Sequence, residues 1–321
     1  MHERLAPLRA WSREAPLQLV GAPGIGKSWL ARAWADEVGG AVWTSAEGVS
    51  TADALRHRLA VQLDVDDADD AVRALEARAP TAWVVDDAEQ ATEALLELPL
   101  PAVPVLVTTR RRLALPGSVV DVGPLPLDRA VDLFVSTARA ARHDFDAEGS
   151  ADAVRSICEA LDGLPLAIEL AAARVRALTP AQVARRLSLD HLTNRHVHGR
   201  HHSLRQALAS AVESVGAQAQ RMLAVASVFG GTFTLEALEA VDAGGVDELE
   251  ELVDAGLVLR ARGAELRLLA PVRAFAGELP RPPGAADAVG RWVVDEIERA
   301  RPWSDAPAWA TWRAQLERMA S

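Results

Sequence analysis

Lysine is nearly absent from this sequence. Of its 34 basic residues only Lys27 is a lysine, and the other 33 are arginines. Arginine therefore supplies positive charge wherever a general cation suffices. A loop that encloses phosphate groups is a place where the planar guanidinium does not replace a compact ammonium. We therefore expect the position of Lys27 to require an ammonium group.

Cysteine and long apolar runs are also scarce. The single cysteine, Cys158, excludes an internal disulfide framework and favours a reducing compartment. Residues Met1 to Arg4 lack the apolar core of a signal peptide. Prolines between positions 99 and 104 interrupt the best candidate for a membrane span. These features predict a cytoplasmic protein without a membrane partner.

Basic residues are outnumbered by acidic ones. The chain has 45 acidic residues against 34 basic ones, and its formal net charge is −11. This balance argues against a general nucleic-acid-binding surface and against a polybasic membrane patch. The length of 321 residues leaves room for two or three domains with cores of their own.

The most informative stretch is residues 21–28, Gly-Ala-Pro-Gly-Ile-Gly-Lys-Ser, which fits G-x-x-x-x-G-K-[ST] at every fixed position. It follows a short apolar run, Leu17 to Val20, and precedes a helical pattern over 28–38. This strand–loop–helix order is the context that a phosphate-binding loop requires. A glycine-rich turn that spells the motif by chance is the alternative.

The chemistry of such a loop assigns roles to its residues. Glycines let the backbone N–H groups point inward, and the following helix adds its positive end. Lys27 would contact the β- and γ-phosphates, and the Ser28 hydroxyl would bind Mg²⁺. The sequence therefore predicts binding of ATP or ADP with Mg²⁺, and the remaining nucleotide-binding residues expected here are Gly21, Pro23, Gly24, Ile25, Gly26 and Trp29.

A second stretch, Thr81 to Asp87, is an apolar run that ends in two acids. A central parallel strand whose carboxyl end faces phosphates has this pattern. Asp86 would hold Mg²⁺, directly or through water, and Asp87 would orient or deprotonate an attacking water. Asp86 and Asp87 are the expected catalytic residues.

A third stretch, Pro104 to Arg110, is another buried strand, and it ends in two hydroxyls and a guanidinium. We expect its polar end to lie beside the Asp86 strand, where Arg110 could detect a γ-phosphate. Alternatively, Arg110 to Arg112 form a basic surface turn.

Strands and helices alternate from residue 17 to residue 122, which predicts a doubly wound parallel sheet with helices on both faces. The predicted fold is thus an α/β P-loop NTPase domain followed by a helical domain and a winged-helix domain. The expected bounds are 1–125 for the nucleotide-binding domain, 126–190 for the helical domain, 191–202 for a histidine-rich linker, 203–280 for the winged-helix domain and 281–321 for C-terminal helices that could begin a helical-repeat sensor.

Two of these segments invite other interpretations. The five histidines of the linker could hold a metal, but arginines crowd them, which favours a solvated connection. The winged-helix pattern consists of helices followed by two strands, at 257–261 and 265–269. Acidic residues over 247–254 occupy the positions where a DNA reader needs arginine, so a structural or regulatory use is favoured over DNA binding.

The order of motifs resembles the NB-ARC branch of the STAND signalling ATPases, above all the ATPase modules of bacterial LuxR-type and SARP-type transcriptional regulators. The segments that carry the resemblance are G-A-P-G-I-G-K-S, V-V-D-D, V-L-V-T-T-R, G-L-P-L-A-I-E-L-A-A-A-R and R-L-L-x-x-V-R-A-F-A, and it covers about residues 3–320.

The resemblance implies a Walker A pair in Lys27 and Ser28, a Walker B aspartate in Asp86 and a γ-phosphate sensor in Arg110. It also implies that Pro165 packs against the adenine. In this family, ADP locks a closed monomer, and exchange for ATP permits opening and oligomerisation. Two motifs depart from the family pattern: only Glu3-Arg4-Leu5 remains of the V-G-R-E segment, and Leu269-Ala270 replace the histidine and aspartate of M-H-D.

The resulting hypothesis is a nucleotide-dependent switch that hydrolyses ATP slowly at most and acts on a protein partner or on further copies of itself. One alternative is a turnover ATPase of the AAA type. Asp87 argues against it, because it occupies the position where such an enzyme would have a catalytic glutamate. The other is a DNA-binding regulator that uses the winged helix.

Overall fold

The computed structural model describes residues 2–98, 101–189, 192 and 204–300. The chain divides into two compact units, Met1–Gly123 (unit 1) and Pro124–Ser321 (unit 2). The histidines expected to form a linker, and the part of the expected C-terminal helices after residue 300, lie outside the described residues. Within the part of the chain that the structure describes, no helix has the length and apolar character needed to cross a membrane.

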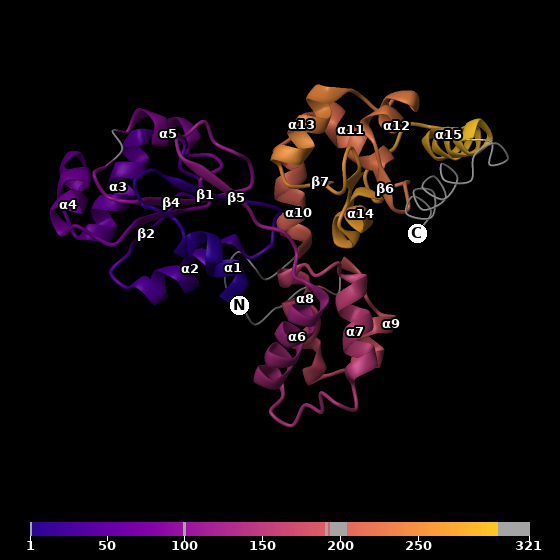
Figure 1. The fold of residues 1–321 in the computed structure, drawn as a ribbon, viewed down its shortest axis with the longest axis horizontal. Coiled ribbons are helices and arrows are strands. Elements are labelled where there is room, and N and C mark those ends of the chain that lie inside the picture. The colour runs from indigo at the N-terminus through magenta and orange to yellow at the C-terminus, as the bar shows by residue number, and fades with distance from the viewer. Residues whose placement is uncertain (1, 99–100, 190–191, 193–203, 301–321) are drawn as a thin grey trace. The chain divides into compact units, whose positions relative to one another are not determined.

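Unit 1 alternates strands and helices along the sequence (Figure 1). Its strands are β1 (Leu17–Val20), β2 (Val42–Ser45), β3 (Trp83–Asp86), β4 (Val105–Thr109) and β5 (Ser118–Asp121). Its helices are α1 (His2–Arg9), α2 (Lys27–Val38), α3 (Ala52–Leu63), α4 (Ala71–Arg78) and α5 (Thr92–Glu97), with a short 3-10 helix η1 (Ala68–Asp70).

The five strands form one sheet in the order β2-β3-β4-β1-β5, and every pair of neighbours is parallel. In the register, Val20 at the end of β1 pairs with Thr109 at the end of β4, and Val85 of β3 pairs with Val107 of β4. The carboxyl ends of β1, β3 and β4 therefore meet at one edge. The predicted parallel α/β fold of this part of the chain is confirmed.

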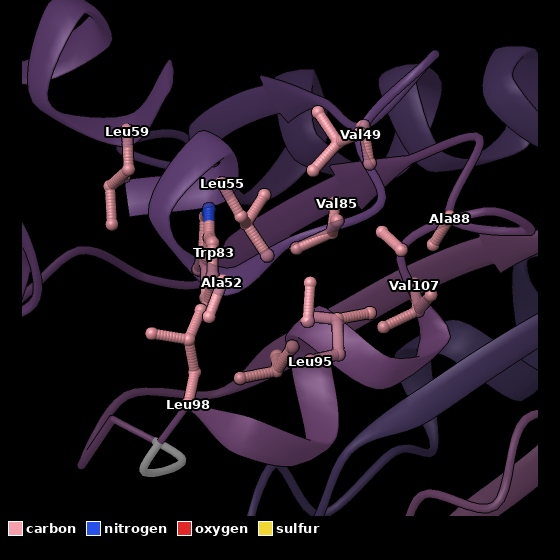
Figure 2. Packing of buried hydrophobic residues seen from close by; sticks show 14 of the residues in the cluster. Val49, Ala52, Leu55, Leu59, Trp83, Val85, Ala88, Leu95, Leu98 and Val107 are labelled. Atoms are coloured by element: carbon pink, nitrogen blue, oxygen red, sulfur yellow. The ribbon is translucent and has the colours of Figure 1, made fainter. Parts of the chain in front are cut away.

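One face of this sheet carries the main apolar core of unit 1. Alternate residues of a strand point to the same face, so Trp83, Val85, Val105 and Val107 form one surface. Figure 2 shows these strands and the side chains of α3 and α5 that cover them; the labelled residues are Val49, Ala52, Leu55, Leu59, Trp83, Val85, Ala88, Leu95, Leu98 and Val107.

Helix α2 covers the other face, where it contacts β1 and β4. Its buried residues are Lys27, Leu30, Ala31 and Trp34, which follow the helical spacing of one face. The ring centroid of Trp34 lies 5.5 Å from that of Trp11, a residue that follows the end of α1. Packing thus fixes α2, and with it the loop that precedes the helix, against the centre of the sheet.

The described part of unit 2 is mainly helical, with one short 3-10 helix and a small three-stranded sheet. In its first part the elements are α6 (Leu127–Ala141), α7 (Ala151–Ala160), α8 (Pro165–Ala172), η2 (Ala173–Arg176) and α9 (Pro180–Arg185). In its second part they are α10 (Leu204–Glu213), α11 (Ala217–Ala226), β6 (Thr232–Phe233), α12 (Leu235–Ala240), α13 (Val246–Asp254), β7 (Leu259–Arg260), β8 (Leu266–Arg267), α14 (Ala270–Ala276) and α15 (Ala285–Ala300).

The expected hairpin is present, but its strands are shorter than the sequence pattern indicates. β7 and β8 pair antiparallel, and a third strand, β6, pairs with β8. The N–H groups of Leu257 and Val258 both donate to the carbonyl of Leu252, so these residues close α13 instead of extending β7. Leu269 precedes the first residue of α14 as its N-cap, which shortens β8.

Candidate nucleotide site

The loop between β1 and α2 depends on glycine at three positions. Gly24 and Gly26 adopt left-handed φ angles of 72° and 94°, which side chains other than glycine rarely tolerate. Gly21 approaches the chain after β5 so closely that a Cβ atom there would lie 2.6 Å from the Val122 carbonyl oxygen. Glycine is thus required at these three positions for conformational or steric reasons.

The loop opens directly into the N-terminus of α2. Gly26 is the N-cap and makes no side-chain capping hydrogen bond. The first N–H groups of a helix have no partner within the helix, and they carry its positive end. The start of this 12-residue helix therefore presents backbone donors to an anion.

Lys27 lies at this point and is 7% exposed. Its Nζ donates to the carbonyl oxygens of Gly21, at 2.8 Å, and Ala22, at 3.2 Å. An ammonium has three donors, so one remains for a phosphate oxygen. Burial lowers the pKa of Lys27 from 10.5 to about 8, while the nearby charge of Glu89 acts in the opposite direction. The cost of burying this cation would be offset by bound phosphate.

Asp86 ends β3 on the same edge of the sheet and is 3% exposed. The Thr108 hydroxyl of β4 donates to its Oδ1 at 2.6 Å, and the Asp87 N–H donates to the same hydroxyl oxygen at 3.0 Å. Because Thr108 is fully buried, this bridge fixes the orientation of the carboxylate. The expected proximity of the ends of these two strands is confirmed by their pairing.

Asp87 begins the turn after β3. Its φ angle is 58°, a left-handed conformation that aspartate tolerates better than most residues. The next N–H group, that of Ala88, donates to the Thr108 carbonyl at 2.9 Å. The turn is therefore tied to β4 by backbone bonds, and the role of Asp87 toward a water molecule stays a prediction.

Arg110 follows β4 and forms an ion pair with Glu89, with 3.2 Å between Nε and Oε1. The two side chains are 26% and 19% exposed. Arg111 and Arg112 are exposed, and Arg112 pairs with Asp121 at 2.9 Å. The basic surface turn is thus formed by Arg111 and Arg112, whereas Arg110 is partly buried at the carboxyl edge of the sheet.

Glu89 was not singled out by the sequence motifs. It lies three residues after Asp86, outside the apolar strand pattern, and nothing in its spacing distinguishes it from a solvated acid. Thr108 could be expected only as one of the hydroxyls at the end of its strand. Both become site residues because β3 and β4 are neighbours in the sheet.

The residues present fit a magnesium ion that is held mainly by nucleotide phosphates. Ser28, in the first turn of α2, and the buried Asp86 would each supply an oxygen. Among the described residues there is no group of three or more histidine, cysteine or acidic side chains able to hold a metal by itself. Mg²⁺ in phosphate sites commonly uses one or two protein oxygens and completes its shell with phosphates and water.

The remaining predicted site residues fall into three groups. Pro23 and Ile25 are buried in the loop, and Ile25 is 1% exposed. Trp29 is 50% exposed on the first turn of α2. Pro165 is the first residue of α8 in unit 2, and its contact with a nucleotide stays a prediction.

Comparison with protein families and curated proteins leaves the family open. No family model matches the chain. An uncharacterized protein, Rv0894, of Mycobacterium tuberculosis (strain ATCC 25618 / H37Rv) is 35% identical over 207 residues, which cover 59% of this chain and 53% of that protein. A second protein of the same strain, Rv0890c, named as a candidate HTH-type transcriptional regulator, is 34% identical over 208 residues, 60% of this chain and 24% of that protein. The chain spans about half of the first relative's length and about a quarter of the second's.

Comparison with solved structures supports the fold. The Walker-type ATPase PABY2304 of Pyrococcus abyssi aligns with a TM-score of 0.59 and 14% identity, covering 85% of this chain and 94% of that chain. A STAND protein with a tetratricopeptide repeat sensor, PH0952 from Pyrococcus horikoshii, aligns with a TM-score of 0.36 and 17% identity, over 94% of this chain and 45% of that chain. The first similarity shows a shared fold, and the second supports no conclusion by itself.

Proposed function

We propose that this chain is a STAND-type molecular switch, which binds ATP or ADP with Mg²⁺ and changes its domain arrangement with the state of the terminal phosphate. The observation that carries the proposal is the buried ammonium of Lys27. It lies at the start of α2, held by two loop carbonyls, and is the only lysine of the chain. A buried cation at an uncapped helix N-terminus is suited to an anion with several negative charges.

The residues around Lys27 divide the work of such a site. Loop N–H groups and Lys27 would hold the phosphates, and Ser28 with Asp86 would hold Mg²⁺. The magnesium ion, when bound, neutralises phosphate charge. A switch also requires a difference in affinity between its two conformations, since a ligand that binds both equally shifts nothing. Arg110 in unit 1 and Pro165 in unit 2 are the residues proposed to supply that difference.

We assign regulatory roles to the two parts of unit 2, as a helical domain (α6–α9) and a winged-helix domain (α10–α14). DNA binding through α13 is disfavoured because its surface carries the exposed acids Asp247, Glu250, Glu251 and Asp254. A protein partner or another copy of the chain is therefore the proposed recipient of the signal. The name of the relative Rv0890c supports a regulatory context, of which this chain would form one module.

The first test is nucleotide binding by the wild type and by Lys27→Ala. After bound nucleotide has been removed, isothermal titration with Mg-ADP is expected to give tight binding by the wild type and a loss of at least about 100-fold in the variant, because a charge-assisted phosphate contact is removed. An Arg32→Ala variant, on an exposed position of the same helix, serves as the matched control. Unchanged affinity of Lys27→Ala refutes the site.

The protein as purified, before any nucleotide is removed, separates the switch from its alternatives. Ion-exchange chromatography of the denatured protein is expected to release near-stoichiometric ADP. Steady-state hydrolysis at about 10 s⁻¹, the usual rate of enzymes, would instead favour a turnover ATPase. Duplex DNA binding that weakens steeply with salt would favour a DNA-binding regulator.

A further inference from the structure

Glu89 and Arg110 form an ion pair that lacks a well-directed hydrogen bond to Oε1 of Glu89. Nε of Arg110 lies 3.2 Å from Oε1 of Glu89. Nevertheless, Oε1 is buried and makes no hydrogen bond of acceptable geometry within the described part of the chain. Arg110 therefore compensates the charge of Glu89 without directing an N–H group at Oε1.

The turn that carries Glu89 is held in place by other contacts. Arg111 Nη2 donates to the Glu89 carbonyl at 3.4 Å, and the Thr92 hydroxyl donates to the same carbonyl at 3.2 Å. Arg110, for its part, follows a strand at the centre of the sheet. Both partners of the ion pair are thus attached to rigid backbone, and the pair can change through rotation of its side chains.

Both partners also lie at the carboxyl edge of the sheet, where the proposed phosphate site is. Arg110 directly follows Thr109, which pairs with Val20 at the end of β1, and Glu89 follows the end of β3. Glu89 and Arg110 act on the pKa of Lys27 in opposite directions, and the effect of Glu89 exceeds that of Asp86. A nucleotide held by Lys27 would therefore place its terminal phosphate close to the pair. That phosphate would attract Arg110 and repel Glu89.

Resting on the proposed nucleotide site, we propose that the Glu89–Arg110 ion pair sets its selectivity between ATP and ADP. ADP leaves the pair intact. ATP has to draw Arg110 away from Glu89, which leaves a partly buried carboxylate beside the terminal phosphate. Breaking a buried pair is costly because the remaining charge is uncompensated. Glu89 therefore favours the binding of ADP. Arg110 favours the binding of ATP, but this gain is reduced by the cost of breaking its ion pair with Glu89.

A double-mutant cycle tests this proposal. Dissociation constants for Mg-ADP and for a magnesium complex of a non-hydrolysable ATP analogue are measured for the wild type, Glu89→Gln, Arg110→Gln and the double variant. Glu89→Gln is expected to shift the ratio of affinities toward the ATP analogue by about tenfold. In the Arg110→Gln background only the direct repulsion between the Glu89 carboxylate and the terminal phosphate remains. The same substitution is therefore expected to shift the ratio by a clearly smaller factor, about threefold or less, and the difference between the two backgrounds measures the coupling through Arg110.

Glu93→Gln is the matched control, since Glu93 is an exposed acid on the first turn of α5. An equal shift of the ratio by Glu93→Gln, or by Glu89→Gln in both backgrounds, overturns the proposal because the effect is then general electrostatics. An unchanged ratio in Glu89→Gln overturns it as well. If Glu89→Gln does not fold, Glu89→Asp withdraws the carboxylate from Nε and is expected to shift the ratio in the same direction; no shift is again a refutation.

The result also separates this inference from the proposed function. If the wild type binds nucleotide, Lys27→Ala does not, and the cycle shows no coupling, only the selectivity role of Glu89 fails. If the wild type binds neither nucleotide, or Lys27→Ala binds as well as the wild type, the proposed site itself fails.

Discussion

At the scale of single residues, Lys27 is notable because a lysine side chain is usually exposed and this one is buried. It is 7% exposed, and burial lowers its pKa to about 8. The composition makes its titration easy to isolate. The chain has no tyrosine, one lysine and one cysteine, so few other groups titrate between pH 8 and 10.5. Burial moreover raises the pKa of the Cys158 thiol to about 12.

This depressed pKa predicts that nucleotide binding takes up a proton above pH 8. The free protein has largely lost the Lys27 proton at pH 8.5, whereas phosphate favours the charged ammonium and raises its pKa. Affinity for Mg-ADP should therefore fall as pH rises through about 8. Titration calorimetry at pH 8.5 in buffers of different ionisation enthalpy should show an uptake of roughly half a proton or more per nucleotide.

The control for this measurement is pH 7, where Lys27 already carries its proton and contributes no uptake. The stability of the protein without nucleotide depends on pH in the opposite direction to the affinity for nucleotide. Because the folded pKa lies below the unfolded value of 10.5, the unfolded chain binds more protons between about pH 8 and 10.5, and Lys27 makes stability rise with pH there. Affinity that is constant from pH 7 to 9.5 would contradict the buried environment of Lys27.

At the scale of elements, the loop before α2 depends on how closely it approaches the chain after β5. A Cβ at Gly21 would lie 2.6 Å from the Val122 carbonyl oxygen and 3.1 Å from Cγ2 of Ile25. Val122 is itself bonded to the end of β1, because its N–H donates to the Val20 carbonyl at 2.7 Å. A larger residue at position 21 therefore has to displace backbone on both sides.

We expect Gly21→Ala to lower the free energy of unfolding by about 1–3 kcal/mol, the usual cost of overpacking, and to weaken nucleotide binding. Gly123→Ala is the matched control, since a Cβ there meets nothing within 4 Å. That variant should stay within about 0.5 kcal/mol of the wild type. Denaturant unfolding of both variants checks the difference, and equal stability of the two would contradict the close approach.

The longer elements of unit 1 were predictable because their apolar residues repeat at strand or helix spacing. β1 was expected at residues 17–20 and is found there, and α2 begins one residue before the helical pattern expected over 28–38. The helices α4 and α5 were not predicted. They have 8 and 6 residues with only two buried residues each, which is too few to produce a recognisable period.

At the scale of the molecule, one contact within unit 2 joins segments 108 residues apart. The Asp162 Oδ2 accepts a hydrogen bond from the Ala270 N–H at 2.6 Å, and its Oδ1 lies 3.8 Å from Nη1 of Arg267. Ala270 is the first residue of α14, whose N-cap Leu269 has no capping side chain. Asp162 thus caps α14 from the turn after α7, directly before the Gly163-Leu164-Pro165-Leu166 segment.

We expect Asp162→Ala to destabilise unit 2 by about 1–2 kcal/mol, the usual value of a helix cap. Exchange of the Ala270 amide should accelerate about tenfold or more, since it loses its acceptor. Asp162→Asn keeps an acceptor oxygen and should retain most of the protection. Amide hydrogen exchange and thermal unfolding measure both effects.

Asp242→Ala is the matched control, because Asp242 has nearly the same left-handed backbone, with φ angles of 55° and 50°, and is exposed. It reports the cost of alanine in this conformation without the loss of the Ala270 bond. If both alanine variants exchange the Ala270 amide equally fast, Asp162 is not the cap of α14.

The sequence by itself determined the parallel α/β fold of unit 1, the glycine-rich loop before α2 and the position of Lys27. Each of these depends on local spacing: an apolar run, glycines at fixed offsets, and a helix that follows directly. The sequence also placed the end of β4 beside that of β3, but only the tertiary structure decided which side chains meet there: Thr108 orients Asp86, and Glu89 pairs with Arg110. Strand order depends on packing between segments distant in the chain, and no local pattern in the sequence encodes which charged side chains then become neighbours.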